Sequence, residues 1–103
     1  MSVVIVATVH PVPEHRADVI AAFEDTIARA HAEDEGCQFY ALHEGDDRLV
    51  MIEKWASQEA LASHSRGSAL ADLTHLLDNK LIGGLDVQVL RPHPAGTTQQ
   101  GTI

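Results

Sequence analysis

The chain is short of cysteine, of long apolar runs and of basic residues. Its one cysteine, Cys37, has no partner for an internal disulfide and no second ligand at the spacing of a metal site. We therefore interpret Cys37 as a small buried hydrophobic residue. The longest nearly apolar run, residues 3–9, is far shorter than the roughly 20 residues that a membrane span requires, so no membrane partner is expected.

Basic side chains are outnumbered: seven Lys and Arg against 15 Asp and Glu give a formal net charge of -8. A negative field repels phosphate backbones and anionic lipid headgroups, so nucleic acid is not an expected partner. A neutral or cationic small molecule suits this surface better. The N-terminal residues have neither the basic start nor the cleavage site of a signal peptide, and we expect a cytoplasmic protein.

Motifs for nucleotide, acyl-transfer and zinc chemistry are also missing. The chain has no glycine-rich phosphate loop and no G-x-S-x-G nucleophile elbow. Its seven histidines are scattered, and none forms the i, i+4 pair with an adjacent glutamate that zinc hydrolases use. We therefore expect no metal site.

What the chain does contain is a regular succession of strand-like and helix-like segments. β-Branched runs and alternation predict strands, and apolar residues spaced three and four apart predict helices. Pro13 suits the first turn of a helix, and Ser57 is a helix cap. The expected elements are a strand at 3–10, a helix from about 13 to about 33, strands at 37–45 and 48–56, a helix in two segments from 57 to 64 and from 67 to Gly83, and a strand at 85–92.

This order of elements predicts an α+β, ferredoxin-like fold of the βαββαβ type. Its four-stranded antiparallel sheet carries both helical regions on one face, in a domain that spans residues 1–92 and precedes a polar tail at 93–103. The other face should be polar in a monomer, yet it is apolar in the first and third strands. We therefore expect a homodimer, closed by packing of sheet against sheet. The residues that make this face apolar are Val4, Val6, Val50 and Ile52.

A tight turn at Asp46 and Asp47 sets the register of the hairpin between the second and third strands. The predicted cross-strand pairs are Tyr40 with Glu53, Leu42 with Met51, and Gln38 with Trp55. Side chains alternate between faces, so one face carries aromatic and polar groups among apolar neighbours, which suits a pocket for a small aromatic ligand. That face holds Tyr40, Leu42, Glu53 and Trp55; the other holds Phe39, Ala41, His43, Val50 and Ile52.

His64 ends the short helix that follows Trp55 and should face the sheet, where an imidazole suits proton transfer near neutral pH. Other interpretations stay open at this point. Trp55 also suits the core, and His64 also suits the role of a favourable partner of the helix dipole. Glu53 has the alternative of bonding to a backbone amide or a basic side chain.

Three segments together resemble the antibiotic biosynthesis monooxygenase family, also called quinol monooxygenase-like proteins. The resemblance extends over residues 2–92, and it implies a dimeric α+β barrel, in agreement with the dimer expected from the apolar faces. The segments are EGCQFYALHEG, RLVMIEKWASQEALASH and LDVQVLRP. The most specific positions are Gly36, Cys37, Tyr40, Glu53, Trp55 and His64.

The resemblance implies a cofactor-independent monooxygenase. Enzymes of this family oxidise polycyclic phenols, anthrones or quinols with molecular oxygen, without flavin, haem or metal, because an electron-rich phenolate can itself reduce oxygen. On this view His64 takes the phenolic proton, Trp55 and Tyr40 wall the pocket, and Glu53 orients a partner. Leu42 and Met51 complete the expected substrate site.

Two alternatives lie within the same superfamily. A haem-degrading branch uses an asparagine in the first strand, and this chain has ATVH at residues 7–10 and no asparagine in that strand, which disfavours haem degradation. The other alternative is a non-catalytic dimer that binds or senses a small aromatic ligand. A different reaction on the same barrel also stays open, because one fold hosts many functions.

Overall fold

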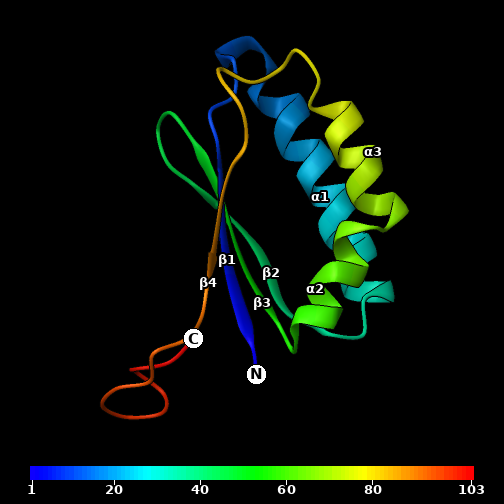
Figure 1. Cartoon of the computed structure of the whole chain (residues 1–103). Helices are drawn as coiled ribbons and strands as arrows, with labels where there is room; N and C mark the ends of the chain where they lie inside the picture. Colours follow the sequence, from blue (N-terminus) through cyan, green and yellow to red (C-terminus); the bar gives the residue numbers. More distant parts are fainter.

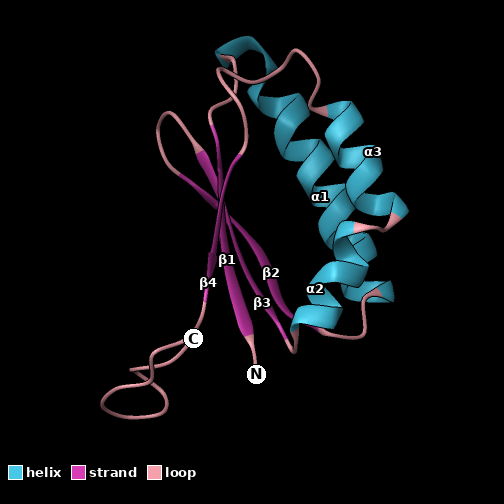
Figure 2. Ribbon diagram, viewed as in Figure 1, coloured by secondary structure: helices cyan, strands magenta, loops and turns pink.

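The computed structural model describes all 103 residues and confirms the ferredoxin-like α+β fold (Figure 1). One antiparallel sheet has the strand order β2-β3-β1-β4. All helices cover one face of this sheet and leave the other without a helix (Figure 2). The strands are β1 (Val3–Val9), β2 (Cys37–Glu44), β3 (Leu49–Trp55) and β4 (Asp86–Leu90); the helices are α1 (Arg16–Glu33), α2 (Gln58–Ser65) and α3 (Ser68–Leu76).

The first helix begins and ends where the sequence predicts. A 3-10 turn, η1 (Pro13–His15), leads into α1, and Pro13 fits its first turn because the missing N–H would have no partner there. The apolar stripe of α1 faces the sheet, with Val19 and Phe23 fully buried. No helix of the chain combines the length and the apolar character that crossing a membrane demands.

The last helix is shorter than predicted. A stripe of leucines at positions 70, 73, 77 and 81 predicts a helix as far as Gly83, but α3 ends at Leu76. Asn79 adopts a left-handed conformation with φ of 62°, which asparagine tolerates better than most residues and which ends the helical path. Beyond it, Leu81 forms an isolated antiparallel bridge with Pro11. The chain there pairs with the segment after β1 instead of continuing the helix.

The hairpin register that the acidic turn predicts is confirmed over most of its length. Tyr40 lies opposite Glu53, and Leu42 opposite Met51. Since side chains alternate between faces, Tyr40, Met51 and Glu53 all point toward the helices. The register therefore places a phenol beside a carboxylate under the helical layer.

The predicted pair of Gln38 with Trp55 is wrong, because Trp55 pairs with Cys37. A β-bulge between Cys37 and Phe39 makes Gln38 an extra residue on β2 and shifts the register by one at that point. Trp55 still faces the helices, because the alternation along β3 itself is unbroken. The bulge changes the partner of the tryptophan and not its face.

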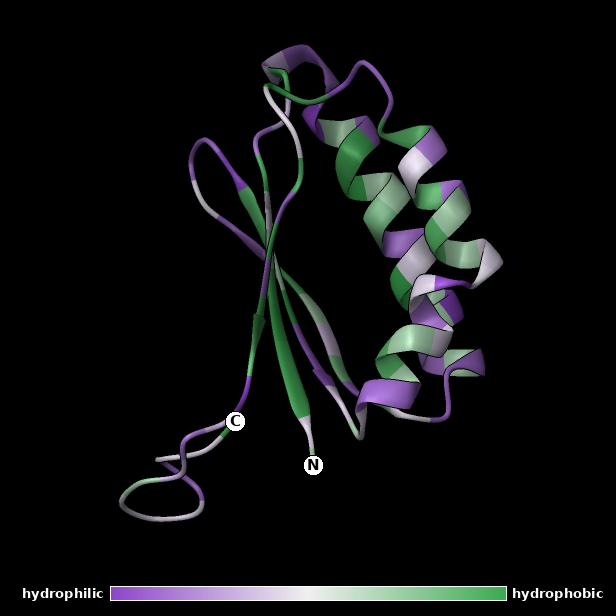
Figure 3. Ribbon diagram, in the orientation of Figure 1, coloured by the Kyte–Doolittle hydropathy of each residue, from purple (hydrophilic) through white to green (hydrophobic).

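The core lies between the helices and the inner face of the sheet. Odd-numbered residues of β1 and β3 form it together with the stripes of α1 and α3, and Trp55 and Leu49 are completely buried. Figure 3 shows hydrophobic residues along β1 and on the helices, in line with this arrangement. Cys37 is partly buried and packs against the core.

The outer face of the sheet is apolar and only partly covered. Val6, Val50 and Ile52 are half-buried, and Phe39 is 45% exposed. The chain's own last residues, 99–103, lie over this face and border shallow hollows on it. No regular element occurs after β4, and the division at residue 92 between domain and tail stays a prediction.

Candidate active site

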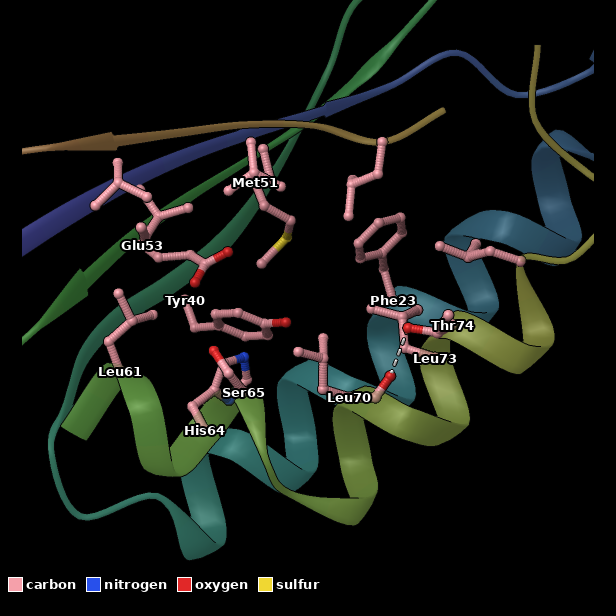
Figure 4. A pocket seen from close by; sticks show the side chains of 16 residues that line it. Phe23, Tyr40, Met51, Glu53, Leu61, His64, Ser65, Leu70, Leu73 and Thr74 are labelled. Carbon is pink, nitrogen blue, oxygen red and sulfur yellow. Dashed lines mark hydrogen bonds between the residues drawn. The ribbon is translucent and has the colours of Figure 1, made fainter. Parts of the chain in front are cut away.

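A cavity of about 220 Å³ lies between the sheet and the helices (Figure 4). Twelve of its 16 lining residues are hydrophobic, so the few polar groups stand in surroundings poor in water. All four strands and all three α-helices contribute to the lining. The 16 lining residues are Ile5, Ala7, Phe23, Tyr40, Met51, Glu53, Leu61, His64, Ser65, Leu70, Leu73, Thr74, Leu77, Leu85, Val87 and Val89.

One side of the cavity opens beside β4. Val87 and Val89 line the cavity, yet they are 46% and 58% exposed, because no helix covers this edge strand. Leu85 is exposed in the same way. A ligand can therefore enter between β4 and α3, with its apolar side against these residues.

Gly36 allows α2 to lie directly against the start of β2. A Cβ atom at position 36 would collide with the Cβ of Ala60, so only glycine permits this approach. The amide of Ala56 donates to the Gly36 carbonyl oxygen at 2.8 Å and fixes the contact. With α2 held there, His64 in its last turn faces the sheet, and its residue is only 5% exposed.

Glu53 is a buried carboxyl group with one donor from the protein. The indole Nε1–H of Trp55 donates to its Oε1 at 2.9 Å. Burial raises the pKa of Glu53, and the Trp55 hydrogen bond and the nearby His64 oppose this rise in part. Trp55 thus holds the carboxyl group in one orientation at the edge of the cavity.

Aromatic contacts and one hydrogen bond to a carboxylate fix the ring of His64. It stacks at a tilt on Trp55, with ring centroids 4.3 Å apart, and meets the ring of Tyr40 edge-on at 5.1 Å. Its Nδ1 lies 2.8 Å from Oδ2 of Asp34, the residue that ends α1. The tryptophan, the tyrosine and the aspartate leave only Nε2 of the imidazole without a protein partner.

Several polar atoms of the lining are available to a ligand. Every fully buried side-chain nitrogen or oxygen has a hydrogen-bond partner, whereas Tyr40 Oη, His64 Nε2 and the second carboxyl oxygen of Glu53 bond to no protein atom, so they must be open to the cavity. Figure 4 shows the Tyr40 ring between the Glu53 carboxylate and His64. Burial, together with the Glu53 charge, raises the pKa of Tyr40 far above its usual value, so the phenol stays a neutral hydrogen-bond donor.

The structure brings together four of the six residues that the sequence nominates. Tyr40, Met51, Glu53 and His64 line the cavity. Trp55 does not line it but lies directly behind Glu53 and His64, completely buried. Leu42 is on the same face of β2 but packs against the core outside the cavity.

Sequence reasoning missed Asp34 and much of the apolar lining. Asp34 is 30 residues from His64 in the chain, and nothing in its local sequence indicates the contact. Phe23 and Leu73 recur at the three- and four-residue spacing of an apolar helix stripe, and Val87 alternates with polar neighbours in the last strand, so the sequence carried a signal for them. No three His, Cys, Asp or Glu side chains meet in an arrangement that could hold a metal ion.

The fold and the cavity together define a small α+β domain with a polar corner in an apolar chamber. The model of one protein family, described as antibiotic biosynthesis monooxygenase, matches residues 2–74 of the chain. The chain belongs to this family, which confirms the resemblance seen in the sequence. Membership supports a monooxygenase-like function in general terms.

Solved structures show the same fold at low sequence identity. Rv0793 from Mycobacterium tuberculosis is 24% identical with a TM-score of 0.86, and the match covers 94% of this chain and 100% of that one. A protein from Caulobacter crescentus that carries the family name is 23% identical with a TM-score of 0.83, over 86% of this chain and 87% of that one. A conserved protein from Methanosarcina mazei is 21% identical with a TM-score of 0.82, over 88% of this chain and 92% of that one. No curated protein matches the chain in sequence.

Proposed function

We propose that the protein is a cofactor-independent monooxygenase that oxidises a small phenol, quinol or anthrone-like substrate with molecular oxygen. One observation carries the proposal. An imidazole nitrogen and a neutral phenol, both without protein partners, face an apolar cavity beside a buried carboxyl group. This arrangement suits a flat ring that carries one or two hydroxyl groups and must lose a proton in dry surroundings.

The size of the cavity favours substrates of one or two fused rings. Its volume of about 220 Å³ exceeds that of an engineered protein cavity of roughly 150 Å³ that binds benzene. It is below the roughly 300–1,000 Å³ of sites for drug-sized ligands. A third ring would have to extend past β4, through the open side.

The reaction balances without a separate reductant. A hydroquinone and O2 give a hydroxyquinone and water: one oxygen atom forms a new C–O bond to the ring, and the O–O bond breaks. The quinol itself supplies the two electrons that reduce the second oxygen atom, and its protons complete the water. The protein needs to bind the substrate, remove its first proton and keep bulk water away from the peroxidic intermediate.

Each polar residue has a place in this proposal. His64 Nε2 is the base that takes the phenolic proton, and Tyr40 Oη donates a hydrogen bond to the phenolate oxygen that forms. Glu53 accepts from the second hydroxyl group of a quinol, and Met51 packs on the ring. Trp55 acts from behind by holding Glu53 and His64. A Trp55→Phe variant that consumes oxygen as fast as the wild type would contradict that assignment.

We also propose that two copies pair through their outer sheet faces. The support is the apolar, half-buried character of that face, with Val50 and Ile52 beside the exposed Phe39. A dimer of this kind leaves the cavity on the opposite side of each sheet. The small aromatic substrate, oxygen and a second copy are therefore the partners that the proposal requires.

Oxygen consumption by purified, metal-free protein tests the proposed function. The panel contains a monocyclic hydroquinone, a naphthohydroquinone and an anthrone, each corrected for autoxidation in the absence of protein. We expect turnover above autoxidation, strongest for the naphthohydroquinone. Tight binding of these compounds with no turnover would contradict the proposed enzymatic activity and favour a protein that senses aromatic ligands.

A further inference from the structure

The hydrogen-bonded pair formed by Asp34 and His64 joins the end of α1 to the end of α2 and includes a residue that lines the cavity. The carboxylate Oδ2 lies 2.8 Å from the imidazole Nδ1. His64 is 5% exposed, whereas the ion pairs that the arginines form lie at the surface. The Asp34 carboxylate thus contacts the histidine that lines the cavity.

The backbone holds Asp34 rigidly in this position. Its amide donates to the carbonyl of Ala30 at 3.0 Å, and its carbonyl accepts from the amide of Cys37 at 3.0 Å. Its carboxylate has no other partner among the side chains or amides of the protein. The carboxylate is therefore committed to His64.

This geometry decides which imidazole nitrogen carries the proton. A carboxylate oxygen only accepts, so Nδ1 must be the donor in the neutral ring, and Nε2 is left with its lone pair. The rings of Trp55 and Tyr40 pack on the imidazole in the orientation that places Nδ1 at Asp34. The lone pair of Nε2 then points toward the cavity, where a base is required.

We infer that Asp34 is the positioning residue of the site: it fixes the Nδ1–H tautomer of His64 and stabilises the imidazolium that forms when Nε2 takes a proton. The inference rests on the proposed function for the identity of the proton donor. The tautomer itself is independent of that function. Asp34 touches neither the cavity nor a substrate in it, so its effect is transmitted through His64 alone.

Nitrogen NMR of the histidine rings tests the tautomer directly. In mildly alkaline buffer, 15N-labelled wild type should show Nδ1 of His64 protonated and Nε2 unprotonated, with the signal assigned by its loss in His64→Ala. Asp34→Ala should lose this preference. Asp34→Asn should keep it, because the amide oxygen still accepts from Nδ1–H. Glu35→Ala is the matched control, because it removes the same charge from an adjacent exposed residue that makes no such bond.

Kinetics with the best quinol then test the consequence. For Asp34→Ala we expect kcat to fall about 10- to 100-fold with little change in KM, a loss like that of the carboxylate partners of metal-bound histidines. Asp34→Asn should lie between this variant and the wild type, and Glu35→Ala should match the wild type. Asp34→Ala in a His64→Ala background should cause no further loss, because the two residues act as one unit.

The outcomes separate this inference from the proposed function. If Asp34→Ala keeps the Nδ1–H tautomer, or keeps the wild-type kcat, the positioning role of Asp34 is wrong, and the proposed monooxygenase activity is unaffected. If the wild type turns over no quinol, the proposed activity is wrong, and the NMR result still decides whether Asp34 sets the tautomer. Should Asp34→Ala fail to fold, Asp34→Asn decides: a kcat equal to that of the wild type would overturn the role of the charge.

Discussion

The two faces of the sheet both carry apolar side chains, but they differ in their cover and in their polar content. On the inner face, Ile5 and Met51 are buried under helices, and Tyr40 and Glu53 stand among them. On the outer face, Ile52 and its neighbours are only half-buried, and no helix lies over them. Because side chains alternate along each strand, chemistry and association are assigned to opposite faces of the same strands.

This difference means that neighbouring positions can test the two roles separately. A substitution on the inner face should affect the cavity or the core, and one on the outer face should affect association.

Two histidines on opposite faces give the strongest test. His64→Ala should lower kcat for quinol oxidation roughly 100- to 10,000-fold, the usual contribution of a general base. His43→Ala, on the exposed outer side of β2, should leave kcat unchanged. Oxygen consumption measures both, with circular dichroism to show that each variant is folded. Equal rates for the two variants would remove His64 from the mechanism.

Adjacent residues of β3 separate association from folding. Ile52→Glu puts a charge on the outer face and should weaken the dimer at least about 30-fold, as a central interface residue does, while the fold persists. Met51→Glu buries the same charge in the core and should prevent folding. Analytical ultracentrifugation reports the association, with Ala21→Glu on the exposed side of α1 as the control. A wild type that is purely monomeric at micromolar concentration would refute the dimer.

The smallest effect concerns the stability contributed by Glu53. Burial raises its pKa in the folded state, so its contribution is complete below the unfolded value of roughly 4.3 and is lost as the pH rises through the folded value. In the Glu53→Gln variant, the side-chain amide does not titrate and its oxygen still accepts from Trp55 Nε1. As the pH rises from about 4 through the folded value, the free energy of unfolding of the wild type should therefore fall relative to that of this variant. Denaturant unfolding at a series of pH values measures this difference in the free energy of unfolding. If the free energies of the wild type and of Glu53→Gln change with pH in parallel, Glu53 is not desolvated.

Local patterns were enough to predict the fold and most of the hairpin. The β-branched strands, the stripe of α1 and the acidic turn each specify their own element, and the turn fixed the pairing of Tyr40 with Glu53. The end of α3 could not be predicted in this way. Its leucine stripe continues to Leu81, but the helix has already ended: Asn79 takes a left-handed conformation, and Leu81 forms a bridge with the distant Pro11.

The candidate site was predictable where it depends on alternation and was not where it depends on tertiary contact. Glu53 and Tyr40 follow from the register, and His64 from the position of a capped helix. The bulge at Gln38 left no mark in the pattern, so the partner of Trp55 was wrong. Asp34 reaches His64 only because α1 and α2 end near each other in space, which no local signal in the sequence encodes.

Oxidation of the best quinol under 18O2 tests the central claim most directly. With metal-free and flavin-free protein, we predict one 18O atom in each molecule of product and the other in water, analysed by mass spectrometry. With the His64→Ala variant in place of the wild type, 18O should enter the product no faster than it does by autoxidation without protein. Product without 18O, or formation of hydrogen peroxide in its place, would contradict a monooxygenase.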